Sequence, residues 1–357
     1  MSILEGLSTE IVGVKLKFPT VLSSGPLSRD EKSIKRAMQQ RGLGAITTKT
    51  ILKSAGDTPR PSMAVFKNNL INFDWDHPGV DSMINMLKTS KDGGFPIIAN
   101  VIGPVDETAR MCQNLEKAGA AMIESFESEA HIKAIKDTIS IPLVIKLNPN
   151  LPDIAKRARM AEKAGADAIS AIGSVGPGLV IDTRTGKPLL GSKYGFGNLT
   201  GPAIKPIALR CVAEIAMAVK IPILGGGGIT NGKDAMEMFM VGAKCVHLHT
   251  AAILGGLGVF EKIINEVKEI MKERGYESLE DVRGMSLKYL DEKPKYELHP
   301  AKVNVNLCNG CGICERVCAY DAIRMEERIA RVDEKACFGC GLCVSICPTR
   351  AIKLSLD

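Results

Sequence analysis

Eight cysteines within the last 50 residues constrain the fold of this chain more than any other feature of its sequence. They form two runs with the same spacing, two residues between the first three cysteines and three residues before the fourth: Cys308, Cys311, Cys314 and Cys318, then Cys337, Cys340, Cys343 and Cys347. A matching segment follows each run, "AIRM" at 322–325 and "AIKL" at 351–354. We therefore expect this part of the chain to be an internal duplication.

This spacing is typical of two 4Fe-4S clusters, because three evenly spaced thiolates bind one cubane while the fourth cysteine of the run reaches the other. Zinc seldom uses such a set, and cytoplasmic cysteines do not stay oxidised as disulfides. The segment resembles bacterial two-cluster ferredoxins, which implies a small α+β domain. We expect one cluster on Cys308, Cys311, Cys314 and Cys347, and the other on Cys337, Cys340, Cys343 and Cys318.

Between about residues 20 and 270, short apolar runs alternate with amphipathic stretches of helical period, the pattern of repeated βα units. Eight such runs favour an α/β fold with a closed (β/α)8 TIM barrel over a doubly wound open sheet, which has similar local patterns. Residues just after each strand are then expected to carry the chemistry. The runs are 20–24, 45–49, 96–101, 121–125, 142–147, 168–172, 222–225 and 245–249.

We expect a barrel at 1–270, a charged linker at 271–300 and a ferredoxin-like domain at 301–357.

Composition and charge set limits on the partners. The net charge of +6 and the aromatic content of 4% give no reason to expect nucleic acid or an anionic membrane surface as a partner. No run of 18 apolar residues is present, and the first ten residues lack a signal-peptide pattern. We therefore expect a cytoplasmic protein without a membrane span.

A pair of iron–sulfur clusters moves single electrons, so the barrel is expected to bind a flavin, which exchanges either one electron or two. "GGGGIT" at 225–230 and "HTAA" at 249–252 follow the seventh and eighth runs, where such barrels bind phosphate. Lys49 and Lys146 end the second and fifth runs. Both would point into the barrel mouth, where a cation can stabilise a reduced flavin or a substrate carbonyl.

Several motifs resemble those of the dihydroorotate dehydrogenase superfamily, and the order of the domains resembles the carboxyl-terminal part of dihydropyrimidine dehydrogenase. The motifs are "SSGPL" (23–27), "TTKT" (47–50), "PIIANVIG" (96–103), "VIKLNPNLPD" (144–153), "LTGPAIKPIALR" (199–210) and "ILGGGGITNGKDAMEMFMVGA" (223–243). The resemblance implies FMN as the flavin. It places Ser24, Lys49, Thr50, Asn100 and Lys146 around the isoalloxazine, and Gly201, Gly227, Gly228 and Thr250 at the phosphate or ribityl chain. His249 stands at a usual glycine position beside the phosphate loop, which suggests a contact with FMN or substrate.

The catalytic loop of the superfamily is not retained. After the fourth strand the superfamily has Asn and then Ser-Cys-Pro-Asn, with Cys or Ser as the base, whereas this chain has "ESFESEAH" at 124–131. Glu127, Glu129 or His131 could act as the base in place of the missing Cys or Ser, with Lys49 as a further catalytic candidate. The same segment is also typical of the start of a helix. The superfamily's substrate asparagines are reduced to Gly173-Ser174 and, at best, "NLINF" at 69–73. Losing several hydrogen-bonding groups together indicates a changed substrate.

These observations predict an FMN- and iron–sulfur-dependent oxidoreductase that acts on a CH–CH bond or an activated C=C bond of a small molecule. Its electrons would pass through the two clusters to an external carrier or a redox partner protein. A homodimer is also expected from the superfamily. Two alternatives remain: dihydroorotate or dihydropyrimidine oxidation with a replaced base, and an electron-transfer subunit without turnover. An open pocket would favour an enzyme, and a pocket filled by Trp75 or Phe126 would favour the subunit.

Overall fold

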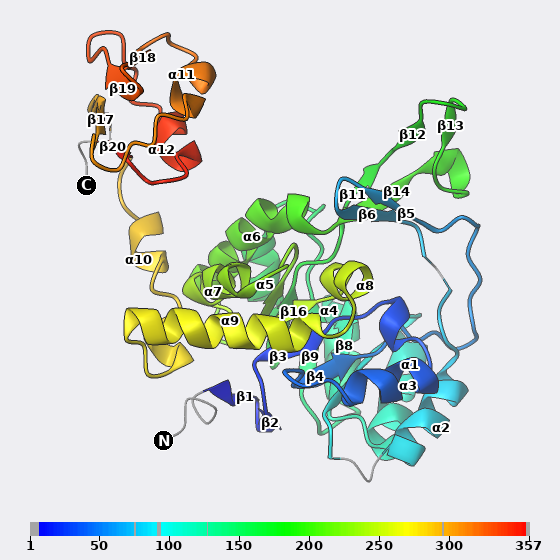
Figure 1. The fold of residues 1–357 in the computed structure, drawn as a ribbon. Coiled ribbons are helices and arrows are strands. Elements are labelled where there is room, and N and C mark those ends of the chain that lie inside the picture. The colour runs from blue at the N-terminus through cyan, green and yellow to red at the C-terminus, as the bar shows by residue number, and fades with distance from the viewer. Residues whose placement is uncertain (1–6, 75, 91–93, 127, 295, 355–357) are drawn as a thin grey trace. The chain divides into compact units, whose positions relative to one another are not determined.

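The computed structural model describes residues 7–74, 76–90, 94–126, 128–294 and 296–354 (Figure 1). The chain divides into two compact units, Met1–Asp291 and Glu292–Asp357. Within the described ranges, none of the helices combines the length and the apolar character needed to cross a membrane.

The first unit is a closed barrel of eight parallel strands, each paired with its neighbour along the chain. Every strand falls within one of the eight apolar runs or extends one residue beyond its end, because a strand covered on both faces is mostly apolar. The closed barrel is thus confirmed over the open sheet. The strands are β3 (Thr20–Leu22), β4 (Ala45–Thr47), β7 (Ile97–Asn100), β8 (Met122–Phe126), β9 (Leu143–Lys146), β10 (Ala168–Ala171), β15 (Ile223–Gly226) and β16 (Cys245–Leu248).

Helices follow the barrel strands and bury their apolar faces against them. Gly119 ends one helix in the left-handed conformation, as helix-ending glycines commonly do. The principal helices are α1 (Glu31–Met38), α2 (Val80–Ser90), α3 (Val105–Ala118), α4 (Glu129–Lys136), α5 (Ile154–Lys163), α6 (Lys205–Ala218), α7 (Gly232–Met240), α8 (Thr250–Gly255) and α9 (Val259–Arg274).

One end of the barrel is closed by apolar packing. Each barrel strand contributes one residue to an inner cluster: Val21, Ala45, Ile98, Met122, Val144, Ala168, Leu224 and Cys245. The amino-terminal hairpin of β1 (Thr9–Ile11) and β2 (Val14–Leu16) adds Ile11 and Leu16 to the same cluster. Since these residues lie at or near the beginning of the strands, any ligand site must form at the carboxyl ends.

Two long excursions from the barrel meet in a four-stranded sheet, in the order β11, β14, β6, β5. Strands β5 (Met63–Phe66) and β6 (Asn69–Asn72) follow β4, whereas β11 (Val175–Gly178) and β14 (Gly197–Thr200) follow β10. The register pairs Asn198 with Asn72. Between β11 and β14, the short pair β12 (Ile181–Asp182) and β13 (Lys187–Pro188) projects away from the barrel (Figure 1).

The part of the expected linker before residue 291 packs with the barrel unit. Helix α9 continues to Arg274, and Leu279 and Val282 are buried. The backbone N–H of Gly284 donates to the carbonyl of Phe239 at 3.0 Å. The short helix α10 (Leu287–Leu290) then leads to the division between the two units.

The second unit repeats one pattern twice. Each half has a pair of left-handed glycines, Gly310 and Gly312 in the first and Gly339 and Gly341 in the second. A short helix follows each pair, α11 (Ile313–Val317) and α12 (Leu342–Ile346). The expected internal duplication is therefore present in the fold. Strand β17 (Ala301–Val303) pairs with β20 (Ile352–Leu354), and β18 (Ile323–Glu326) pairs with β19 (Ile329–Val332).

Candidate active site

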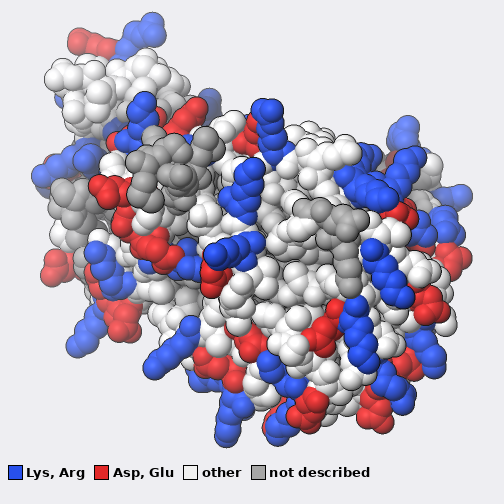
Figure 2. All heavy atoms as spheres, turned by 90° about the horizontal axis from the view of Figure 1, so that it is seen from below, with Lys and Arg blue, Asp and Glu red and all other residues white. Residues whose placement is uncertain are grey.

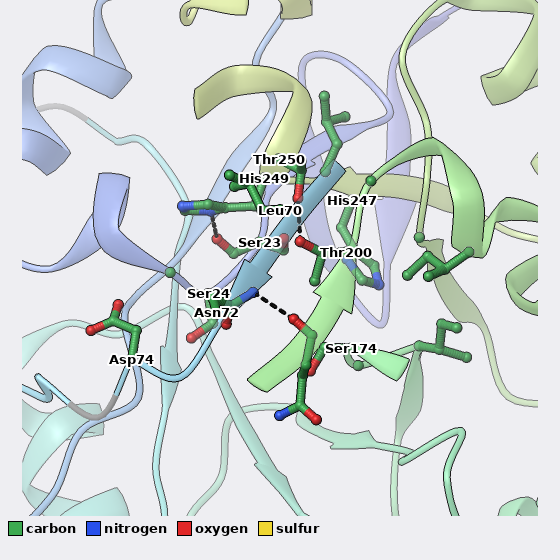
Figure 3. A pocket seen from close by; sticks show the side chains of 18 of the residues that line it. Ser23, Ser24, Leu70, Asn72, Asp74, Ser174, Thr200, His247, His249 and Thr250 are labelled. Carbon is green, nitrogen blue, oxygen red and sulfur yellow. Dashed lines mark hydrogen bonds between the residues drawn. The ribbon is translucent and has the colours of Figure 1, made fainter. Parts of the chain in front are cut away.

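A cavity of about 430 Å³ lies at the carboxyl ends of the barrel strands. Residues that end or follow all eight barrel strands line it, and the two excursions contribute further side chains. Figure 3 shows polar side chains from separate segments around this cavity, among them Asn72, Ser174 and Thr200. Its volume falls in the range of cofactor and substrate sites.

The glycine-rich turn after β15 lines one part of the cavity. Gly227 and Gly228 have φ angles of 122° and 80°, which favour glycine. Thr230 donates to the Asp234 carboxylate through both its backbone N–H, at 2.8 Å, and its hydroxyl, at 2.7 Å. Lys205 donates to the same carboxylate at 2.6 Å. The Asp234 carboxylate thus fixes the conformation of the turn. The backbone N–H groups of such a turn can bind a phosphate.

The beginning of α8 completes this part of the cavity. Thr250 donates its hydroxyl to the hydroxyl of Thr200 at 2.8 Å (Figure 3). Gly201, with a φ angle of 104°, follows Thr200, and a Cβ atom there would lie 3.0 Å from the Cα of Asn69. The close approach of the two excursions therefore requires glycine at this position.

Two lysines in the cavity are each paired with a carboxylate. Lys49 donates to the Asp74 side chain at 2.6 Å and to its carbonyl at 3.1 Å. Lys146 lies 3.4 Å from the Glu124 carboxylate, which also accepts from the side chain of Asn100. Burial acts to raise the pKa of Glu124, but Lys146, His247 and hydrogen bonds lower it overall. Glu124 is therefore ionised at pH 7, and it lies next to the cavity without lining it.

Two histidines lie at the end of the last barrel strand, His247 within β16 and His249 just after it. Both are neutral at pH 7, because burial lowers the pKa of each to about 4. The Nε2 atom of His249 accepts from the backbone N–H of Leu27 at 3.3 Å, so its Nδ1 carries the proton and donates to the carbonyl of Ser23 at 2.6 Å. A Cβ atom at Gly25 would lie 2.5 Å from this ring. His249 thus holds the loop after β3.

These histidines predict an acid-sensitive fold. Their folded pKa lies below the ordinary value of 6.5, so the unfolded chain binds protons more readily between pH 6.5 and 4. The free energy of unfolding should therefore fall as the pH decreases through this window, by about 3 kcal/mol for each histidine. Urea unfolding at pH 7 and pH 4.5 measures this, and His249→Gln should make the loss clearly smaller. An unchanged loss in that variant would contradict the assignment.

Most residues expected to contact FMN line the cavity: Ser24, Lys49, Thr50, Lys146, Gly201, Gly227, Gly228, His249 and Thr250. Asn100 is fully buried, and its side chain reaches Glu124 and is not part of the cavity lining. The glycines, the lysines and a buried backbone turn fit the phosphate and ring of FMN.

Two of the three candidates for a replacement base, Glu129 and His131, do not line the cavity. Glu129 is exposed and pairs with Lys133 at 2.6 Å, and this hydrogen bond lowers the pKa of Glu129, opposite to what a base acting near pH 7 needs. His131 lies 2.8 Å from the carbonyl of Gly103 through its Nε2 atom. Both belong to α4, for which Ser128 is the N-cap residue, as the helix-start alternative predicts. Glu127 lies outside the described residues.

Sequence reasoning missed an acidic residue and three amides that line the cavity: Asp74, Asn148, Asn150 and Asn198. Asn72 also lines the cavity and lies in the segment 69–73 that the resemblance offers as a reduced substrate loop. Asn148 and Asn150 directly follow β9, so their position after a predicted strand was an available signal. Asn72 and Asn198 become neighbours only through the pairing of β6 with β14. No local sequence pattern indicates that pairing.

In the second unit, one cysteine of the first run lies beside three cysteines of the second run. Cys318, from the first run, lines a small cavity together with Cys337, Cys340 and Cys343 of the second run. The backbone N–H of Ala322 donates to the sulfur of Cys318 at 3.4 Å. In the other half, Ala351 donates to Cys347 in the same way at 3.3 Å. Thiols in this arrangement fit 4Fe-4S clusters.

Comparison with known proteins agrees with both units. Residues 6–271 match the family model described as dihydroorotate dehydrogenase, and residues 301–354 match a 4Fe-4S dicluster domain. Similar proteins include the dihydroorotate dehydrogenase B (NAD(+)) catalytic subunits of Methanothermobacter thermautotrophicus, Caldicellulosiruptor saccharolyticus and Pyrococcus abyssi. They are 33%, 36% and 32% identical, over 78%, 78% and 79% of this chain and 98%, 98% and 99% of the relative.

The family match covers the barrel and its cavity, and the dicluster match covers all eight cysteines. FMN and iron–sulfur clusters are therefore the cofactors, and the reaction is a flavin-dependent oxidation or reduction at a CH–CH bond. The chain belongs to the dihydroorotate dehydrogenase family.

Proposed function

We propose that this protein oxidises a CH–CH bond, or reduces an activated C=C bond, of a small molecule and exchanges the electrons with an external carrier through two 4Fe-4S clusters. One observation carries this proposal: a single chain contains both the barrel cavity and the eight-cysteine unit. When bound, FMN supplies the exchange of two electrons with a carbon–carbon bond and of one electron with a cluster.

Different residues of the cavity would bind the phosphate, contact the flavin ring and orient the substrate. Gly227, Gly228 and Thr250 would hold the phosphate, while Lys146 would face the flavin ring as a cation held by Glu124. Amide side chains, which both donate and accept hydrogen bonds, would orient the substrate beside the ring. The long excursions that carry several of these amides would limit the access of water.

Dihydroorotate oxidation is a second candidate, because the relatives are named for it. Against it, β8 ends at Phe126 and α4 begins at Glu129, which leaves only two residues for the loop that holds the base in the superfamily. Phe126, one of the two residues considered as a plug, lines the cavity. Trp75, the other residue considered as a plug, lies outside the described residues.

The relatives are named catalytic subunits, which supports a small-molecule substrate and a protein partner. The acidic and basic side chains on the face of the molecule shown in Figure 2 are interspersed. This face therefore offers a redox partner local charge pairs and, among its described residues, no broad surface of a single charge.

Anaerobic absorbance spectroscopy tests the proposed reaction. The dithionite-reduced holoprotein, freed of excess dithionite, is mixed in turn with uracil, thymine, orotate and 2-cyclohexenone, all of which contain a C=C bond activated by a carbonyl. We expect at least one to restore the oxidised flavin band. If none does, while cytochrome c still oxidises the protein, the chain is an electron-transfer subunit and the proposal is wrong.

A further inference from the structure

The lysines that line the cavity carry no uncompensated charge in the part of the chain that the structure describes. The Lys49 and Asp74 side chains are 6% and 11% exposed, and their charged atoms are 2.6 Å apart. The Lys146 and Glu124 side chains are 15% and 3% exposed. Each lysine thus has its own carboxylate in an environment with little water.

The histidines around the cavity do not add positive charge at pH 7. Burial lowers the pKa of His247 and of His249 to about 4. The pKa of His77 is also lowered, first by burial and then by the nearby Lys49. A substrate that enters the cavity therefore meets paired lysines and neutral imidazoles.

Binding of a substrate carboxylate in this cavity would be unfavourable. To reach Lys49 it would have to approach Asp74, and like charges repel strongly where water is scarce. Its lost hydration would not be replaced by a free cation. An uncharged amide or imide avoids this cost, because the amide side chains of Asn72 and Asn198 line the cavity. The Asn72 amide nitrogen donates to the carbonyl of Asn198 at 3.2 Å, and its oxygen can still accept.

We propose, on the basis of the proposed function, that the substrate is an uncharged carbonyl or amide compound, and that Asp74 excludes carboxylates by holding Lys49. Asp74 thus determines specificity. Dihydroorotate carries a carboxylate and belongs to the excluded class, whereas an uncharged dihydropyrimidine or a related cyclic amide does not. Specificity of this kind rests on a repulsive element as well as on attractive contacts.

A matched pair of ligands tests the proposal without turnover. Orotate and orotamide share a ring and differ in a carboxylate against a carboxamide, and their binding to the oxidised holoprotein is followed by the change in flavin absorbance. Asp74→Asn should bind orotate at least about tenfold more tightly than the unaltered protein does, with less than about a threefold change for orotamide. The unaltered protein should prefer orotamide.

Two further variants make the test specific. Asp76→Asn removes the same charge two residues away, where Asp76 pairs with Arg29 at 2.9 Å, and should change neither affinity. The double variant Lys49→Gln, Asp74→Asn should show no gain for orotate, because the unpaired cation is gone. The proposal is overturned if Asp74→Asn gains nothing for orotate, or if the unaltered protein binds orotate more tightly than orotamide. Neither result depends on whether the protein turns over a substrate.

Discussion

Changing Cys311 and Cys340 to serine together should slow electron transfer to an external protein carrier at least about 100-fold, while FMN remains bound. These cysteines hold equivalent positions in the two halves of the second unit, and both are exposed. Their replacement removes one thiolate from each cluster without opening a buried core, and serine oxygen is a poor substitute for thiolate at iron–sulfur sites. The flavin, held by the barrel unit, loses its route to a carrier too large to enter the cavity.

Rapid mixing of the photochemically reduced holoprotein with cytochrome c measures the effect. The flavin band should be reoxidised slowly in the double variant and at the usual rate in Glu334→Gln, which changes an exposed residue of the same unit. The FMN content of the double variant should equal that of the unaltered protein. Unchanged reoxidation would mean that the flavin reaches the carrier directly, and loss of FMN would contradict the independence of the two sites.

The barrel and the cluster ligands could be predicted from the sequence because each rests on a local pattern. A strand that is buried on both faces is a short and mostly apolar run, so the sequence alone predicts β9 and β16. The cysteine spacing likewise reflects the geometry of a cubane. Lys49 and Lys146 were predicted for the same reason, since a residue at the end of a barrel strand faces the mouth.

The charge pairs in the cavity could not be predicted in this way. Asp74 reaches Lys49 only because the β5–β6 excursion folds back over the barrel, and nothing in the chain near Asp74 indicates that path. His249 shows the opposite case. It lines the cavity, as a contact with FMN or substrate requires, but both of its ring nitrogens hold the Ser23–Leu27 loop, which its sequence position does not indicate. Residue type and position alone do not tell a ligand contact from a structural one.

Replacing Lys146 by methionine should destabilise the barrel unit by about 3–5 kcal/mol, the largest loss expected from a single change in the cavity. The reason is the partner left behind: Glu124 is 2% exposed, and without Lys146 its carboxylate would be buried with no cation beside it. The double variant Lys146→Met, Glu124→Gln should recover most of this stability, because an uncharged amide can keep the hydrogen bond with Asn100.

Urea unfolding of the full-length protein, followed by far-ultraviolet circular dichroism at pH 7, measures these differences. Lys133→Met is the matched control, because it removes the same charge from a pair with Glu129 in which the side chains are 60% and 58% exposed. Its effect should stay below about 1 kcal/mol. If Lys146→Met is no less stable than this control, Glu124 is not held by Lys146. If the double variant is as unstable as Lys146→Met, the loss comes from packing and not from the unpaired charge.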